Sequence, residues 1–144
     1  MALTWETGHV SPYSTRLGQT PMQWIGPRNK PPLPRAADAA LPLVMFEAPC
    51  VLRSAATEAL DRAGIAWRIA LTSPSVAGIW AAVDAGLGVT LRTRIGLPAH
   101  LDIIEGMPQV PSLGYELHHS QATPSAAVAQ LAALIQNSLE QQAF

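Results

Sequence analysis

The sequence predicts an α/β protein: a three-layer sandwich in which a mostly parallel sheet lies between helices. Three observations support this prediction. Residues 41–93 alternate between short apolar runs and longer segments with apolar residues at steps of three and four. Prolines stand where each helical pattern begins, and glycines stand where it ends. Strands that alternate with helices of this length pair in parallel through right-handed crossovers.

The first strand is predicted at residues 43–46, an apolar run without alternation, as in a strand covered on both faces. Pro49 opens the next helix, because proline is tolerated in the first helical turn. Gly64 ends that helix, since glycine readily adopts the left-handed conformation that closes a helix. The predicted apolar stripe consists of Val51, Leu52, Ala55, Ala59, Leu60 and Ala63.

The second unit has the same plan, with a strand at residues 67–71 and a third strand at residues 88–91. Between them, a hydroxyl residue, Thr72 or Ser73, is expected to cap a helix whose first position is Pro74. Gly86 ends this helix. Its predicted apolar stripe consists of Val76, Ile79, Trp80 and Val83.

The flanking segments are less regular. Short strands are predicted at residues 2–6, 22–25 and 101–104, and an alternating, half-exposed strand at residues 113–118. Residues 7–20 are polar and rich in turn residues, typical of a linker or hinge. Residues 26–40 are proline-rich and are interpreted as an irregular surface connection, with a proline-rich recognition peptide as the alternative. Residues 106–111 form a second crossing segment.

A terminal helix is predicted after Thr123-Pro124-Ser125, which repeats the hydroxyl-plus-proline start. The strand at residues 2–6 has no upstream neighbour with which to pair. The predicted stripe of the terminal helix consists of Val128, Leu131, Ala132, Ile135 and Leu139.

Composition indicates a soluble, cytoplasmic protein with about one domain's worth of core. The chain has 144 residues, of which 49% are hydrophobic and 13% charged, and its net charge is −1. No cluster of Lys or Arg indicates nucleic-acid binding. No apolar run approaches the roughly 20 residues of a membrane span, and no secretory signal pattern is present. Cys50 is the single cysteine, so no internal disulfide is expected.

Motifs for catalysis, metals and cofactors are absent from the sequence, so no catalytic residue, metal or cofactor is expected. The adjacent pair His118-His119 cannot form a two-ligand face on a strand, because neighbouring side chains point to opposite sides. Gly86-Leu87-Gly88 enters a strand, unlike a dinucleotide fingerprint, which leaves one. Cys50 has two interpretations: a small buried hydrophobe, or a thiol activated at a helix N-terminus.

Binding is better supported than catalysis. In open α/β sheets, ligands bind beyond the carboxyl ends of the strands, near helix N-termini. Residues 47–50 and 72–75 lie at two such places, and the second offers hydroxyls and backbone N–H groups suited to a small anion. Ser73 has the alternative role of capping its own helix. Thr90 and Arg92, on the adjacent strand, are placed to approach the same cleft.

The run FEAPCVLRSAATEALDRAGIAWRIALTSPSVAGIWAAVDAGLGVTLR resembles the effector-binding domain of LysR-type transcriptional regulators. Upstream, ALTWE and LGQTPMQWIGP resemble the strands that close the first subdomain and open the second. Downstream, LGYELHHSQATPSAAVAQLAALIQNSLEQ resembles the return strand and final helix, so the similarity spans nearly the whole chain. The residues around FEAPC and WRIA resemble those of the family branch that contains LrhA- and PecT-like regulators.

The resemblance implies a fold like that of type 2 periplasmic binding proteins, with a small anionic or aromatic effector held between two subdomains. Regulators of this family work as dimers or tetramers and bind DNA through an N-terminal winged helix-turn-helix. The effector-binding residues that the resemblance implies are Ala48, Pro49, Cys50, Thr72, Ser73, Ser75, Val89 and Thr90, with Pro74 and Gly88 beside them.

The sequence departs from the family pattern because it contains no helix-turn-helix and lacks the first strands of subdomain one. We therefore expect a truncated chain, with subdomain two complete at residues 10–106 and subdomain one only partial, at residues 1–9 and 107–144. The unpaired edges of these parts predict self-association. DNA binding is expected only through the missing N-terminal domain.

Three functional classes follow. The first is the sensory domain of a LysR-type regulator, and the second is a stand-alone solute-binding protein of the same fold. The third is an enzyme or a redox sensor that uses Cys50.

Overall fold

The computed structural model describes residues 1–8, 11–28 and 39–141, and the described part contains eight strands and three helices. They form two compact units, one of Met1–Pro21 with Ser112–Phe144 and one of Met22–Pro111. We call these unit 1 and unit 2 and describe each by itself. The elements of unit 2 are β3 (Met22–Pro27), β4 (Leu41–Met45), α1 (Val51–Arg62), β5 (Trp67–Thr72), α2 (Val76–Asp84), β6 (Thr90–Thr93) and β7 (Leu101–Ile103).

Unit 2 contains one parallel strand pair and one antiparallel sheet. β4 pairs in parallel with β5, and α1 is the crossover between them. β3 lies between β6 and β7 and is antiparallel to both. A single parallel bridge, from Leu43 to Val89, joins β4 to the residue that precedes β6.

The prediction of a mostly parallel sheet is therefore wrong: the sheets are small, and most of the pairing is antiparallel. The βα units predict β4 and β5 correctly, because a helix crossover forces parallel pairing. β6 instead pairs with β3, and β3 precedes both of the predicted strand–helix segments in the chain. Nothing local in either segment specifies that long-range choice.

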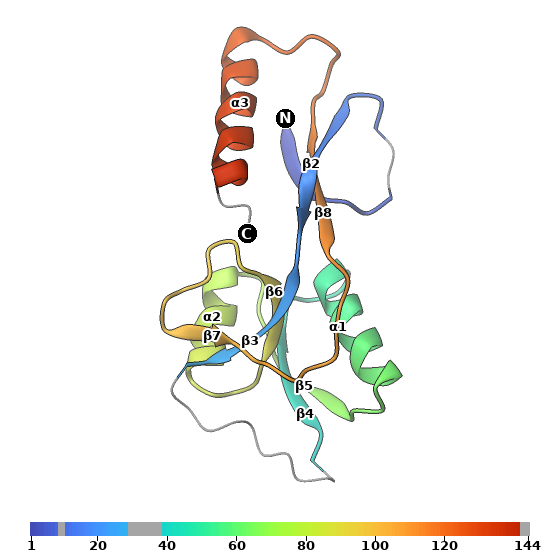
Figure 1. The fold of residues 1–144 in the computed structure, drawn as a ribbon, viewed down its shortest axis with the longest axis vertical. Coiled ribbons are helices and arrows are strands. Elements are labelled where there is room, and N and C mark those ends of the chain that lie inside the picture. Colours follow the sequence, from blue (N-terminus) through green and yellow to red (C-terminus); the bar gives the residue numbers. More distant parts are fainter. Residues whose placement is uncertain (9–10, 29–38, 142–144) are drawn as a thin grey trace. The chain divides into compact units, whose positions relative to one another are not determined.

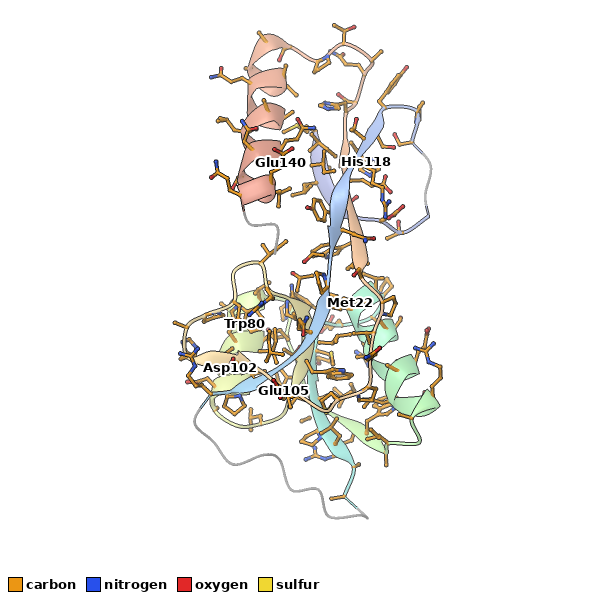
Figure 2. The ribbon with its side chains drawn as sticks, viewed as in Figure 1. Met22, Trp80, Asp102, Glu105, His118 and Glu140 are labelled. Carbon is orange, nitrogen blue, oxygen red and sulfur yellow. The ribbon has the colours of Figure 1, made fainter. Side chains whose placement is uncertain are left out.

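The two helices of unit 2 lie on opposite sides of its strands (Figure 1). On the α2 side, Trp80 projects from the helix toward the strands (Figure 2). The core there consists of Ile25, Val44, Ile79, Trp80, Ala82, Val83 and Leu101, with Phe46, Leu71 and Leu97 packed against it. α1 buries Leu52, Ala56, Ala59 and Leu60.

The predicted stripes need three corrections. Val76 is 39% exposed, because it lies at the first position of α2, before the helix has turned onto the strands. On α1, Ala56 is buried in place of Ala55, and Ala63 lies beyond the helix as its C-cap. The small alanine side chains allow either neighbour to face inward, so their periodicity specifies the buried face only loosely.

Both helices begin later than predicted. Cys50 is the N-cap of α1 and Ser75 is the N-cap of α2, so Pro49 and Pro74 each precede the cap. The Ser75 hydroxyl accepts a hydrogen bond from the backbone N–H of Gly78, at 3.1 Å, which fixes the start of α2. The predicted glycine ends are confirmed: Gly64 and Gly86 have φ of 66° and 81°.

Unit 1 contains a three-stranded antiparallel sheet of β1 (Ala2–Trp5), β8 (Leu113–His118) and β2 (Ser14–Thr20), with β8 in the middle. The prediction that residues 7–20 form a linker is wrong for residues 14–20, which form β2. Its polar side chains conceal the strand pattern, since six of its seven residues are only partly buried or exposed. The strand near Met1 also has a partner within the chain, because Leu3 pairs with Leu117.

The last helix, α3 (Ala126–Gln141), follows the strands of unit 1. Its start is confirmed, because the Ser125 hydroxyl accepts from the Val128 N–H at 3.4 Å. Its predicted stripe is only partly covered. Ala132 is buried, whereas Leu131 and Leu134 are 49% and 59% exposed.

The proline-rich connection predicted at residues 26–40 lies mostly outside the described residues. Among the described helices, none has the length and hydropathy that crossing a membrane would require.

Candidate functional site

The candidate site lies where β4 and β5 end and the chain enters α1 and α2. Phe46 follows β4 and Ser73 follows β5, and the Ser73 N–H donates to the Met45 carbonyl at 3.1 Å. The two loops are therefore held side by side at one edge of the parallel pair. We call residues 46–50 and 72–75, with Val89 to Arg92 on the neighbouring strand, the β4–β5 carboxyl edge.

The first loop ends at the N-terminus of α1. Ala48 and Pro49 are exposed and joined by a cis peptide bond, and Cys50 is half-buried. Cys50 has extended backbone angles (φ −149°, ψ 121°), but its side chain makes no capping hydrogen bond. The N–H groups of the first turn of α1 therefore have no side-chain acceptor at the N-cap. Arg53, in that turn, donates to the Phe46 carbonyl at 3.2 Å.

In the second loop, two hydroxyls already have partners. Ser73 is buried, and its hydroxyl accepts from the Ser75 N–H at 3.2 Å. Ser75 is exposed but caps α2. Thr72, at the end of β5, is exposed, and no described residue hydrogen-bonds its hydroxyl. Of the three hydroxyls in this loop, that of Thr72 is the most accessible to a ligand.

The predicted residues Val89 and Thr90, at the start of the neighbouring strand β6, are buried. Val89 and Thr90 are each 1% exposed, and the Thr90 hydroxyl lies 4.0 Å from the sulfur of Met45. Because they are covered, they are not accessible to a ligand. The structure thus brings the predicted residues of the two loops together, whereas Val89 and Thr90 are packed in the interior beside β4.

Arg92 is a charged group at this edge; the sequence placed it near the cleft, although it is not among the effector-binding residues that the resemblance implies. Alternation along β6 places it on the same face as Thr90, and that sequence signal indicates its position. Its guanidinium carbon lies 4.9 Å from the centre of the Phe46 ring and 5.7 Å from that of Trp80. Burial lowers the pKa of Arg92 from its ordinary value, and the nearby Cys50 opposes part of that shift.

Across the described part of the chain, no group of three or more His, Cys, Asp or Glu side chains is placed to hold a metal ion. Cys50 is a free thiol. The chemistry available at the edge is therefore a cation over aromatic rings, an open helix N-terminus and a free hydroxyl, which together suit the binding of a small polar or anionic molecule.

Comparison with known proteins defines the class as the substrate-binding domains of bacterial transcription regulators. The family model described as the LysR substrate binding domain matches residues 6–140. The chain belongs to this LysR substrate-binding domain family.

Two relatives are transcription regulators. The chain is 35% identical over 105 residues to the HTH-type transcriptional regulator DgdR of Burkholderia cepacia, a match that covers 71% of this chain and 35% of DgdR. It is 35% identical over 78 residues to the HTH-type transcriptional regulator PecT of Dickeya dadantii, covering 52% of this chain and 25% of PecT. The chain thus matches about a third or less of the length of these relatives.

Solved structures share the fold. The regulatory domain of HypT from Salmonella typhimurium has a TM-score of 0.72 at 13% identity, and the match covers 94% of this chain and 72% of that domain. DarR of Vibrio fischeri, solved in complex with DNA, has a TM-score of 0.71 at 16% identity, covering 94% of this chain and 49% of DarR. At these identities the likeness concerns the fold alone.

Proposed function

We propose that this chain is the effector-sensing part of a LysR-type transcription regulator, in which binding of a small molecule alters the activity of the whole protein. The observation that carries the proposal is the match to the LysR substrate-binding domain over residues 6–140. The related DgdR and PecT are both transcription regulators. The family is one of regulators, and the proposal therefore assigns no catalytic role to Cys50.

The effector site is proposed at the β4–β5 carboxyl edge, in accordance with the general rule for ligands of open α/β folds. The proposed ligand is a small anionic or aromatic metabolite. Thr72 and the N-terminus of α1 at Cys50 are the accessible polar groups. Ala48 and Pro49 offer exposed apolar surface beside them, while Ser73 and Ser75 fix the second loop and Val89 and Thr90 are buried.

The assignment of residues 10–106 to one subdomain, and of residues 1–9 and 107–144 to a partial second one, stays a prediction. DNA contact is proposed for another part of the regulator, since this chain matches only 35% of DgdR. A regulator that acts on chromosomal DNA must reside in the cytoplasm of a bacterial cell, which is where we place it. Self-association belongs to the same proposal, because family regulators act as oligomers.

The test is a ligand screen on the 144-residue chain. Small carboxylates, amino acids and aromatic acids are added singly, and the thermal unfolding midpoint is measured. A ligand that binds only the folded chain raises this midpoint, and the stabilisation grows with the logarithm of 1 + [L]/Kd. We expect at least one metabolite to raise the midpoint with this dependence on concentration, and calorimetry to show saturable binding with a stoichiometry of one.

Recovery of the ligand separates a sensor from an enzyme. After overnight incubation, mass spectrometry should find the bound metabolite intact and in its original amount. Consumption of the metabolite, or a screen in which no compound shifts the midpoint, would contradict the proposed sensing function.

A further inference from the structure

The guanidinium of Arg92 is half-buried and has no charged partner within the described residues. Three ion pairs of the described part of the chain join Arg16 to Glu6, Arg28 to Asp102, and His118 to Glu116, and none of them involves Arg92. No described carboxylate or carbonyl accepts a hydrogen bond from Arg92. Withdrawing a cation from water without such a partner is costly, so a group in this position favours an incoming anion.

The surrounding charges do not supply that anion. Arg53 is a second cation, and its N–H is directed at the Phe46 carbonyl. Glu47 is the acidic residue next in sequence to the edge, but it is exposed and forms no ion pair with a described residue. The local charge around Phe46 is therefore positive.

The aromatic rings orient the guanidinium. Cation–π contact with Phe46 and Trp80 compensates part of the cost of burial and holds the position of the charged group. The N–H donors of an arginine radiate in the plane of its fork, which matches the two oxygens of a carboxylate. A guanidinium that is held in position, and whose donors bond no described residue, is suited to bidentate binding of a planar monoanion.

The N-terminus of α1 adds a second set of donors on the same side of the edge. α1 has 12 residues, and its N-cap Cys50 makes no side-chain hydrogen bond, whereas α2 is capped by Ser75. The positive end of the α1 dipole lies close to Phe46, because Arg53 in the first turn donates to the Phe46 carbonyl, and Arg92 lies over the Phe46 ring. The Arg92 guanidinium and the N-terminus of α1 both favour a negatively charged group near Phe46.

We infer that Arg92, held by Phe46 and Trp80 beside the N-terminus of α1, binds the carboxylate of the effector. This inference rests on the proposed function, because it names the chemical class of the ligand of the same edge. The class is a small monocarboxylic acid whose carboxylate pairs with Arg92. The remainder of the molecule then lies against the exposed surface of Ala48 and Pro49.

The experiment uses phenylacetate as the probe and phenylacetamide as its neutral analogue of nearly the same shape. Proton–nitrogen spectra of the 144-residue chain resolve arginine Nε–H signals, and the Arg92 signal is assigned by its loss in Arg92→Lys. We expect phenylacetate to move this signal saturably, and phenylacetamide to leave it in place. Arg92→Met should weaken phenylacetate binding on the order of ten- to a hundredfold, because a hydrogen-bonded ion pair is lost.

Two further variants keep the test decisive if Arg92→Met folds poorly. Cys50→Asp places a carboxylate at the N-cap of α1. This carboxylate should cap the helix, take the place of the ligand's carboxylate beside Arg92, and so abolish phenylacetate binding. Arg62→Met removes an exposed arginine from the last turn of the same helix and should leave the binding constant unchanged. It controls for the loss of one positive charge from the chain.

An Arg92 signal that does not respond to phenylacetate would overturn the inference, as would equal affinity in Arg92→Met and the unaltered chain. Failure here is distinguishable from failure of the sensing function. A metabolite from the thermal screen that binds Arg92→Met as tightly as the unaltered chain removes the carboxylate–Arg92 pairing but leaves the sensor intact.

Discussion

At the scale of single residues, burial decides which leucines stabilise the domain. Leu60 has no exposed surface and packs from α1 against the strands of unit 2, whereas Leu134 on α3 is 59% exposed. Both belong to helices and have the same intrinsic helix propensity, so only their surroundings distinguish them.

Leu60→Ala should lower the free energy of unfolding by about 2–5 kcal/mol, because it removes buried methyl groups and leaves a cavity. The matched variant Leu134→Ala should change it by less than about 0.5 kcal/mol. Urea denaturation followed by tryptophan fluorescence measures both. Equal losses in the two variants would show that Leu60 is not part of a packed core.

The serines of the second loop show why residue identity alone did not assign roles. Ser73 and Ser75 are both hydroxyl residues in the motif TSPS. In the folded chain, Ser73 accepts from the Ser75 N–H, and Ser75 accepts from the Gly78 N–H. The sequence predicted a helix start here correctly, but placed the cap two or three residues too early, because each of these hydroxyls satisfies the same local rule.

At the scale of elements, β4 and the start of β6 approach each other closely at the parallel bridge between Leu43 and Val89. The Val44 N–H donates to the Val89 carbonyl at 2.8 Å, and the Val89 N–H donates to the Pro42 carbonyl at 3.0 Å. A Cβ atom at Gly88 would lie 2.5 Å from the Pro42 oxygen and 2.8 Å from its carbonyl carbon. Glycine is required there because no flexible side chain can move aside.

Gly88→Ala should therefore destabilise the chain by about 1–3 kcal/mol, as overpacking does, and should loosen the bridge itself. Amide hydrogen exchange provides the local readout: exchange at Val44 and Val89 should accelerate relative to the unaltered chain. Leu87→Ala, at the exposed neighbouring position, is the control and should leave both amides protected. Unchanged protection in Gly88→Ala would mean that the bridge tolerates a side chain.

Elements with strong local periodicity were predicted well, and those specified by distant partners were not. The three helices, β4 and β5 were identified from apolar spacing and from their glycine and hydroxyl boundaries. β2 was missed because its side chains are polar and mostly exposed, and because Gly18 and a bulge after Arg16 interrupt its alternation. Its partner strand, β8, lies about a hundred residues further along the chain, so no local pattern in the sequence indicates the pairing.

At the scale of the whole molecule, unit 1 carries more exposed apolar surface than a small three-stranded sheet and one helix need. Leu3, Leu131 and Leu134 are between 47% and 59% exposed. The strands β1 and β2 are the edges of their sheet among the described strands. Exposed apolar side chains and open strand edges both favour association with a second copy.

The chain should accordingly self-associate in a concentration-dependent way, and Leu131→Glu combined with Leu134→Glu should shift it to monomer. Sedimentation velocity measures the mass, and circular dichroism confirms that α3 remains folded. Leu87→Glu makes the same change at a 48% exposed leucine of unit 2 and should leave the association unchanged. A monomer at every concentration, or equal behaviour of the two charged variants, would contradict association through unit 1.

The sequence by itself determined the order of strands and helices in residues 41–93, the glycine ends of the helices, and the family to which the chain belongs. These features depend on spacing along the chain, and neighbours in sequence are enough to specify them. Only the tertiary structure decided that β6 pairs with β3 and that Arg92 lies over Phe46 and Trp80, with no carboxylate partner among the described residues. Strand partners and the environment of a charge arise from segments that meet only when the chain has folded, so no local pattern encodes them.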